Sequence, residues 1–336
     1  RRFPPARAAG VAWVAAALWM VHPMVTESVN YIIQRTELFM AVFLLGALYC
    51  VIRGLEAPGD SRRGWYAGAV FCCALGMASK EVMVVAPPIL LLYDRVFWSA
   101  SWRELLRRRG WLHAALASTW GVLAALVVGD WRPVTAGFGV MNSWHYWLTQ
   151  GGVLFHYLRL AVWPYPLSTD YVDWPLATSL AQAWPGVLGM LGVLALLGWA
   201  LRRHTALGFL GVWCLLLLAP TSLMPIITES VAERRMYLPL AALMLLAVLA
   251  GHRLLQRRRG ATLGGAVLLL SALSGTTVLR NLDYRTEERM LRDVIAKRPA
   301  NVTAHYNLGN VLYANGDVAG AVAEYHETLR LRPGYA

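Results

Sequence analysis

Four polar segments interrupt a chain that is otherwise strongly apolar, and they hold most of the side chains that could perform chemistry. They run from His22 to Glu37, from Ser79 to Glu81, from Asp130 to Trp184 and from Thr228 to Pro239. The candidates are the acids Glu27, Glu37, Glu81, Asp170 and Glu233, the bases Arg35, Lys80, Arg159, Arg234 and Arg235, and His22. Arg and Lys neutralise a phosphate, whereas a carboxylate accepts a hydroxyl proton or holds a divalent metal. Together they suit a site that binds a phosphate and activates a hydroxyl.

Each of these residues also has a purely structural interpretation. Adjacent opposite charges at helix ends often satisfy each other or extend into the membrane interface. Such pairs are expected for Arg35 with Glu37, Lys80 with Glu81, and Glu233 with Arg234 and Arg235. Pro23 after His22 stops a helix, and Asp170 could cap its own loop. The alternatives stay open for each residue, but the convergence of all segments on one face favours a site.

Several well-defined motifs are absent from the sequence. It has no His-Glu-x-x-His spacing, no Gly-rich nucleotide loop and no Gly-x-Ser-x-Gly elbow, so an ATPase or a serine hydrolase has no support. The four cysteines, Cys50, Cys72, Cys73 and Cys214, lie in apolar runs and are interpreted as buried, unpaired side chains. No metal site is predicted, although a divalent metal requirement is left open.

The elements that must position these residues are membrane-spanning helices. Of 336 residues, 57% are hydrophobic and 15% are charged, and the charges cluster between runs that approach a membrane span in length. Backbone groups in the bilayer core must be satisfied internally, so the runs are predicted to be helices. About nine spans are expected, at 8–21, 38–52, 65–79, 81–97, 111–129, 185–201, 205–222, 236–252 and 261–279. The moderately apolar stretch from Trp144 to Val162 is predicted to be an interfacial or re-entrant helix.

The net charge is +12, and the basic residues are unevenly distributed between the loops. Basic clusters fill alternate loops, which predicts that those loops are cytoplasmic. The charge therefore matches anionic lipid headgroups, and no nucleic-acid partner is predicted. All four polar segments then face the outside, as does the C-terminal tail. This is the layout of a multi-pass protein of the bacterial inner-membrane type.

Residues 281–336 are charged and have a helical period. Within 301–334, the spacing of Tyr306, Gly309, Ala321, Tyr325 and Pro333 is typical of a 34-residue tetratricopeptide repeat, which is a pair of antiparallel helices. One repeat cannot bury its own apolar face, so more are expected beyond residue 336. The predicted domains are a membrane domain over 1–280 and a repeat region over 281–336.

The order of the motifs resembles a known family. The resemblance rests on His22-Pro23-x-x-Thr26-Glu27, Arg35-x-Glu37-Leu38, Ser79-Lys80-Glu81, Tyr157-Leu158-Arg159 with Ser168-x-Asp170-Tyr171, Glu233-Arg234-x-x-Tyr237-Leu238-Pro239, and the repeat. Together they resemble the transmembrane and tetratricopeptide-repeat-containing protein O-mannosyltransferases and their bacterial relatives. The similarity covers nearly the whole chain.

The resemblance implies an all-α, GT-C-type glycosyltransferase that uses a polyprenyl-phosphate sugar and inverts the anomeric centre on the outer face. The repeats would present a protein or glycan acceptor. Arg234, assisted by Arg235, Arg35 or Lys80, would bind the donor phosphate, and Glu27 and Glu37 would contact the acceptor or sugar. Such enzymes carry an essential acid in their first outer loop, which is expected upstream of residue 1. The chain is thus expected to be N-terminally truncated and catalytically incomplete.

Two other functions are alternatives to an enzyme. A non-enzymatic scaffold would use the helices to anchor repeats that recruit envelope proteins, and it would not need paired acids and bases outside. A transporter would show paired halves and charges at mid-span, and the sequence shows neither. We therefore expect an enzyme, with the scaffold as the alternative.

Overall fold

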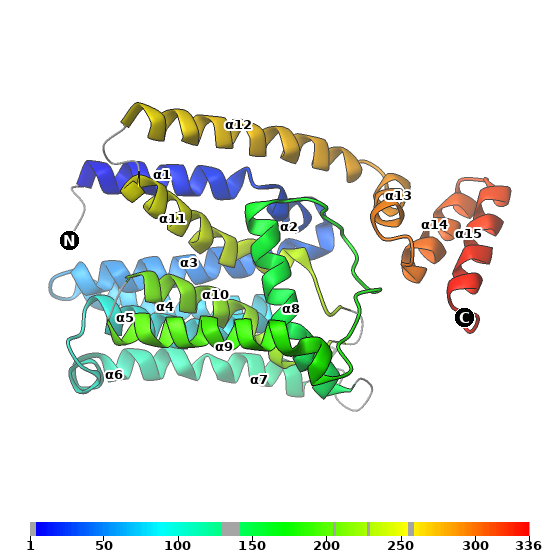
Figure 1. The fold of residues 1–336 in the computed structure, drawn as a ribbon. Helices are drawn as coiled ribbons and strands as arrows, with labels where there is room; N and C mark the ends of the chain where they lie inside the picture. The colour runs from blue at the N-terminus through cyan, green and yellow to red at the C-terminus, as the bar shows by residue number, and fades with distance from the viewer. Residues whose placement is uncertain (1–4, 130–141, 204–205, 227–228, 255–258, 336) are drawn as a thin grey trace.

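The computed structural model describes residues 5–129, 142–203, 206–226, 229–254 and 259–335. Asp130 and Thr228, which begin two of the polar segments, lie outside these ranges. Within the ranges the chain is helical and contains no β-strand, which confirms the predicted all-α class. The longer helices lie side by side as a bundle, and three shorter helices follow at one end of it (Figure 1).

The bundle contains α1 (Pro5–Met20), α2 (Thr26–Asn30), α3 (Arg35–Glu56), α4 (Ser61–Ser79), α5 (Ala86–Phe97), α6 (Trp102–Ser118), α7 (Trp120–Val128), α8 (Ser143–Val162), α9 (Leu180–Arg202), α10 (Ala206–Leu223), α11 (Tyr237–Leu254) and α12 (Arg259–Asp283). The 3₁₀ turns η1 (Pro23–Val25), η2 (Ile32–Gln34), η3 (Glu81–Val85) and η4 (Glu233–Met236) join some of them. The C-terminal helices are α13 (Glu287–Lys297), α14 (Val302–Ala314) and α15 (Val318–Leu331).

Among the described residues, six helical segments are long and apolar enough to cross a membrane, which makes the chain a multi-pass membrane protein. A bent pair, Ala8–Met20 with Pro23–Asn30, would make a seventh. The expected spans 65–79 and 81–97 are helical but do not meet this criterion. The reason is that α4 begins with Ser61 and two arginines, and α5 has only 12 residues.

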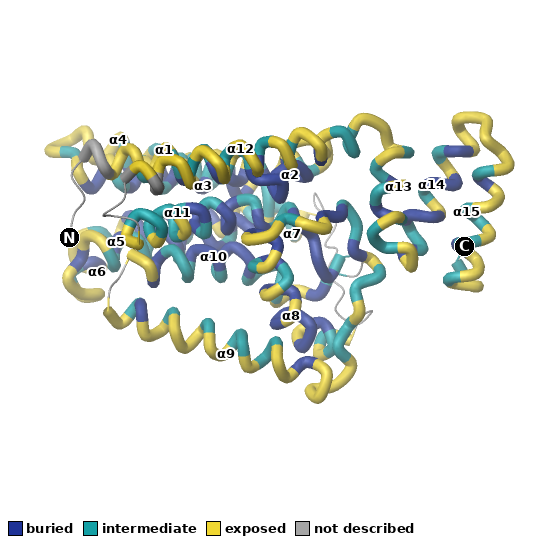
Figure 2. Tube along the Cα trace, turned by 45° about the horizontal axis from the view of Figure 1, so that its top comes forward, coloured by how far each residue is buried: buried dark blue, intermediate teal, exposed yellow. Residues whose placement is uncertain are grey.

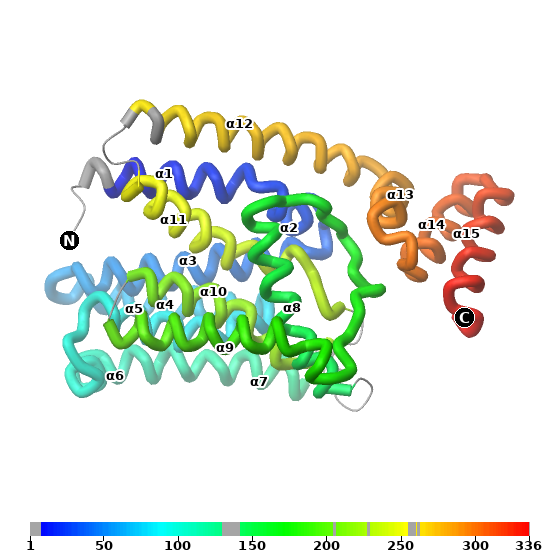
Figure 3. Tube along the Cα trace, viewed as in Figure 1, coloured from blue at the N-terminus to red at the C-terminus, as the bar shows by residue number. Residues whose placement is uncertain are grey.

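Small and apolar side chains pack together helices that are far apart in the sequence. The α3–α4 pair forms one side of a core that includes Leu44, Ala69, Met77 and Ile89. On another side α1 contacts both α11 and α12, which follow much later in the chain (Figure 3). All four cysteines are free; Cys73 and Cys214 are buried as expected, whereas Cys50 and Cys72 are only half-buried.

The periphery of the bundle is apolar and exposed. In α9 only Ala183 and Ala200 are buried, whereas Leu188, Leu191 and other leucines are exposed (Figure 2). In water such a surface would be unfavourable, but lipid tails solvate it. The helix α9 therefore presents most of its surface to the bilayer.

The helix α8 runs across the direction of the bundle helices (Figure 1). It coincides with the stretch predicted to be interfacial or re-entrant, and it is not among the segments that meet the membrane-crossing criterion. Asn142 caps it by accepting from the amides of Trp144 and His145. The helix ends at Val162, before the loop that carries Asp170.

Glycines allow α8 to approach α9 closely. A Cβ on Gly151 would lie 2.5 Å from the carbonyl carbon and oxygen of Gly186, whereas a Cβ on Gly152 would meet nothing within 4 Å. We expect Gly151→Ala to destabilise the protein by about 1–3 kcal/mol, because backbone atoms would have to separate. The matched control Gly152→Ala should leave stability unchanged or raise it slightly. Thermal unfolding in detergent tests the pair, and equal melting temperatures would contradict the close approach.

The three C-terminal helices form a module with its own small core. Leu291 and Val294 of α13 pack with Ala304, Leu308 and Leu312 of α14 and with Ala321 of α15. Gly309 lies directly under the ring of Tyr325, where a Cβ would come within 2.5 Å of a ring carbon. The module thus has the helical hairpin expected over 301–334, and its assignment as a tetratricopeptide repeat stays a prediction.

Candidate functional site

Residues from all four polar segments gather at the end of the bundle that adjoins the C-terminal module (Figure 1). Their contacts join positions that are far apart in the sequence. Glu27 contacts Arg234, Glu37 contacts Lys80, and Glu233 contacts the loop after α8. The segments therefore converge as the sequence analysis expected.

A buried ion pair joins the beginning of the chain to η4. Glu27 is 2% exposed; its Oε1 lies 2.7 Å from Arg234 Nη1, and its Oε2 accepts from the Arg234 amide at 3.0 Å. Arg234 also contacts the Glu229 carboxylate. Arg234 therefore uses its charge on two carboxylates, and its bond to Glu27 holds η4 against the first polar segment.

Glu37 lies in the first turn of α3 and is buried, although its neighbours Arg35 and Thr36 are exposed. Its Oε1 accepts from Lys80 Nζ, which ties the start of α3 to the end of α4. The positive end of the α3 dipole also favours a carboxylate in this turn. Glu37 is thereby fixed at the edge of the apolar core.

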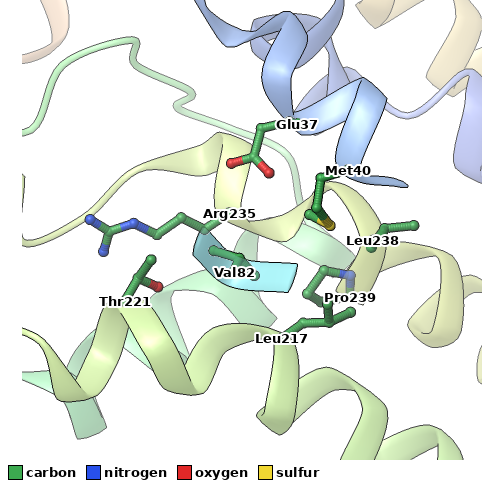
Figure 4. Close-up of a pocket in the computed structure, with 8 residues that line it drawn as sticks. All are labelled: Glu37, Met40, Val82, Leu217, Thr221, Arg235, Leu238 and Pro239. Atoms are coloured by element: carbon green, nitrogen blue, oxygen red, sulfur yellow. The ribbon is translucent and has the colours of Figure 1, made fainter. Parts of the chain in front are cut away.

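A pocket opens beside Glu37 (Figure 4), with an empty volume of about 270 Å³ that includes its mouth. Arg235 and Thr221 supply its other polar side chains. The remaining lining is apolar and consists of Met40, Val82, Leu217, Leu238 and Pro239. The pocket thus combines one acid, one base and an apolar wall.

Arg235 lies beside the pocket with its guanidinium pointing away from Glu37 (Figure 4). The guanidinium donates to the carbonyl oxygens of Glu229 at 2.7 Å and Ser230 at 3.3 Å. Carbonyl oxygens orient the group without cancelling its net charge, so Arg235 can still attract an anion. The base and the acid therefore occupy different parts of one pocket.

Glu233 differs from the expectation that it would pair with the arginines that follow it. Its Oε1 accepts from the Ser168 amide at 2.6 Å and from the Tyr171 hydroxyl. Glu233 is 2% exposed, and these bonds attach the start of η4 to the loop after α8. The acid is therefore a link between two elements of the site.

The other predicted site residues lie around this cluster. His22 is buried; its Nδ1 accepts from the Met24 amide, and its Nε2 lies 3.2 Å from the Ala161 carbonyl oxygen, so it caps η1. Asp170 accepts from the Val172 amide at 2.8 Å, which is the loop-capping alternative. Arg159 is exposed and donates to the Tyr165 carbonyl. Arg35 and Glu81 are also exposed.

Within the described ranges, no group of three or more His, Cys, Asp or Glu side chains could hold a metal ion. The acids of the site are instead bound by Arg, Lys, Tyr or backbone N–H donors. The chemistry that these residues offer is therefore charge pairing and proton acceptance.

His156, which belongs to α8, is enclosed by aromatic rings. Its ring centre lies 4.7 Å from that of Trp174 and 5.5 Å from that of Tyr171, and its Nε2 has no hydrogen-bond partner among the described residues. Burial, together with the smaller effect of the charges of Arg159 and Arg298, lowers the pKa of His156 to about 4. The imidazole is therefore neutral at physiological pH.

This shift predicts a loss of stability in mild acid. A pKa that is lower in the folded than in the unfolded state contributes stability above pH 6.5 that is lost as the pH falls towards 4. After allowance for partial exposure, we expect a loss of about 1–2 kcal/mol. His156→Phe should reduce the drop in melting temperature between pH 7.5 and 5. Identical pH dependence in the variant and the wild type would contradict the shift.

Sequence reasoning missed several residues of the site. Tyr171 and Ser168 appeared only as part of a motif, and their bonds to Glu233 could not be read from spacing. Tyr157 takes part in none of the ion pairs described above. Its hydroxyl accepts a hydrogen bond from the Ala232 amide at 2.9 Å, which holds the segment before η4. Arg298 lies in the C-terminal region, and no motif or spacing in the sequence marks it as a site residue.

Comparison with known proteins gives this geometry a family context. Residues 6–129 match the family model described as dolichyl-phosphate-mannose-protein mannosyltransferase. Protein O-mannosyl-transferase F38B6.6 of Caenorhabditis elegans is 25% identical over 97% of this chain and 46% of its own length. Human protein O-mannosyl-transferase TMTC4 is 27% identical over 93% of this chain and 48% of its own length. The chain is similar in sequence to the protein O-mannosyltransferases.

A bacterial protein extends the comparison. Undecaprenyl phosphate-alpha-4-amino-4-deoxy-L-arabinose arabinosyl transferase 2 of Pseudomonas fluorescens is 29% identical over 84% of this chain and 47% of its own length. The chain spans about half the length of these curated relatives. No solved structure matched the chain. The resemblance to O-mannosyltransferases and their bacterial relatives is thus confirmed.

The O-mannosyltransferase family match covers only part of the candidate site. It includes Glu27, Glu37 and Lys80 but ends before Arg234 and Arg235. The alignments with the animal O-mannosyltransferases extend over nearly the whole chain. Both halves of the Glu27–Arg234 pair therefore lie within the length of chain shared with these relatives.

Proposed function

We propose that this chain is the membrane part of a glycosyltransferase that moves a mannose-like sugar from a polyprenyl phosphate to an acceptor hydroxyl. The observation that carries the proposal is the pocket that combines Glu37 and Arg235 with an apolar wall. A polyprenyl-phosphate sugar has the matching parts, which are an anion, a polar ring and a hydrocarbon tail. The name of the bacterial relative includes such a donor, and the animal relatives are named as mannosyltransferases.

In this proposal Arg235 binds the donor phosphate, with Lys80 contributing charge nearby. Arg234, held by Glu27, keeps η4 in place. Leu217, Leu238 and the other apolar residues of the pocket contact the first units of the lipid. The positive charge stabilises the phosphate as the bond between the sugar anomeric carbon and the phosphate oxygen breaks.

Glu37 supplies a base in the same pocket. A new bond forms between the anomeric carbon and the acceptor oxygen, and the hydroxyl proton passes to a carboxylate, either Glu37 or an acid outside this chain. Attack opposite the leaving phosphate inverts the anomeric centre. Glu27 takes no proton in this scheme because Arg234 holds both of its oxygens.

The orientation and the domain roles are part of the proposal. The distribution of basic residues supports an outer location for the site and for the C-terminal module. Residues 1–280 would bind the donor, and 281–336 would begin a tetratricopeptide array that presents a protein or glycan acceptor. The array and the site are adjacent because α13 follows α12 directly.

Turnover of a defined donor tests the proposal. We expect the full-length protein in nanodiscs to release polyprenyl phosphate from polyprenyl-phosphate mannose, faster when an acceptor is present. Nanodiscs without the protein provide the background, and the Arg235 variants discussed below show whether release depends on this pocket. Failure of a well-folded protein to release lipid phosphate from any hexose or pentose donor would favour the non-enzymatic scaffold.

A further inference from the structure

The C-terminal module reaches the candidate site through Arg298, which directly follows α13. Arg298 Nε lies 2.5 Å from Asp173 Oδ1 in the loop between α8 and α9. Its guanidinium carbon lies 4.7 Å from the ring centre of Tyr171 and 5.7 Å from that of Trp174. A guanidinium at these distances is attracted to the ring faces. One side chain of the module thus clamps both an acid and two aromatic rings of the loop.

The ring under Arg298 also contacts the buried acid of η4. The Tyr171 hydroxyl donates to Glu233 Oε1, so this tyrosine touches the module with its ring and the site with its hydroxyl. Tyr171 is 4% exposed and has little freedom to move. Two residues after Glu233 comes Arg235, which borders the pocket. A short path of direct contacts therefore connects Arg298 to the pocket.

A second set of contacts fixes the direction from which Arg298 approaches. Asp293 of α13 receives Arg280 of α12 at 2.5 Å and Lys297 of its own helix at 2.6 Å. The Arg280 side chain is 6% exposed. Buried pairs of this kind hold the angle between two elements because losing either partner is costly. The module is therefore attached to the bundle as a rigid neighbour.

We propose that Arg298 is a positioning residue of the sugar-transfer site, acting through Tyr171 and Glu233 on the placement of η4 and Arg235. This inference rests on the proposed function and adds to it that the C-terminal module is part of the catalytic unit. Occupancy of the module by an acceptor would then bear directly on the loop that orders the site.

Kinetics of four variants test the proposal with polyprenyl-phosphate mannose as the probe. We expect Arg298→Ala to lower kcat for lipid phosphate release roughly tenfold, because small misplacements of catalytic groups reduce rates up to about 10²-fold. The KM for the donor should change little. Arg298→Lys should recover part of the rate, since an ammonium also binds Asp173 and aromatic faces. Tyr171→Phe should lower kcat about as much as Arg298→Ala does. The double variant Arg298→Ala with Tyr171→Phe should be no slower than the slower of the two single variants.

A control and a second readout separate this inference from the proposed function. Arg330→Ala, at an exposed position of α15, should leave the rate unchanged. Hydrogen exchange should show faster exchange of the amides over 231–237 in Arg298→Ala than in wild type, whether or not the protein turns over. An active wild type with an equally active Arg298→Ala variant would overturn the inference alone. Unchanged exchange over 231–237 would overturn it even if wild type proved inactive.

Discussion

Arg235→Ala is expected to lower the rate of polyprenyl phosphate release by about 10²–10³-fold, the usual cost of removing a group that stabilises developing charge. The guanidinium is oriented by the carbonyl oxygens of Glu229 and Ser230 and borders the pocket, so alanine removes both the charge and its orientation. Arg235→Lys should be intermediate, because an ammonium keeps the charge but lacks the planar fork. Initial rates over a range of donor concentrations measure both effects.

The control for this prediction is Arg203→Ala. Arg203 follows α9, is exposed and lies over the ring of Trp199, at the other end of the bundle. Its removal changes the net charge of the protein equally but leaves the pocket intact. Equal rates for Arg235→Ala and Arg203→Ala would place the phosphate site elsewhere.

Glu27→Ala is expected to cause the largest loss of stability among the single substitutions considered. It leaves Arg234, whose side chain is 12% exposed, without its most buried partner and leaves the Arg234 amide without an acceptor. Breaking a buried ion pair costs about 3–5 kcal/mol, and the remaining contact with Glu229 lowers this to about 3 kcal/mol. Glu27→Gln should cost less, because the amide oxygen can still accept. Thermal unfolding in nanodiscs measures the effect.

A double variant separates the ion pair from a general loss of packing. The double variant Glu27→Ala with Arg234→Ala should lose less stability than the two single variants lose in sum. When both side chains are removed, neither charge is left buried without its partner. Glu327→Ala, in an exposed pair with Arg330, should leave the melting temperature unchanged. Additive losses for Glu27 and Arg234 would show that the pair does not contribute as a unit.

The sequence predicted the all-helical membrane bundle because long apolar runs have no other structure in a bilayer. It also predicted that the polar segments converge, since alternate loops lie on the same side of a membrane. The number of crossings is harder to predict, because helices inside a bundle need not be as apolar as those in contact with lipid. The helix α4, with Ala69, Cys73 and Met77 in the core, is such a case.

Which acid meets which base could not be predicted. Neighbours in the sequence suggested Glu233 with Arg234, but the buried partner of Arg234 lies 207 positions away. Pairing of this kind depends on the packing of α1 against α11, and helix packing is not visible in the composition of single segments. Arg298 was missed for the same reason, because its partners belong to a loop with no periodic pattern.

The Glu27–Arg234 pair also bears on how the protein is made. Glu27 enters the membrane early in synthesis, and Arg234 arrives only after α10 has been inserted. Until then Glu27 lacks the arginine that pairs with it in the folded protein, and an unpaired carboxylate at the membrane is costly. A partly made chain therefore carries a carboxylate whose buried partner has not yet been synthesised. Synthesis of η4 supplies the missing partner, so the site can be completed only late in the making of the chain.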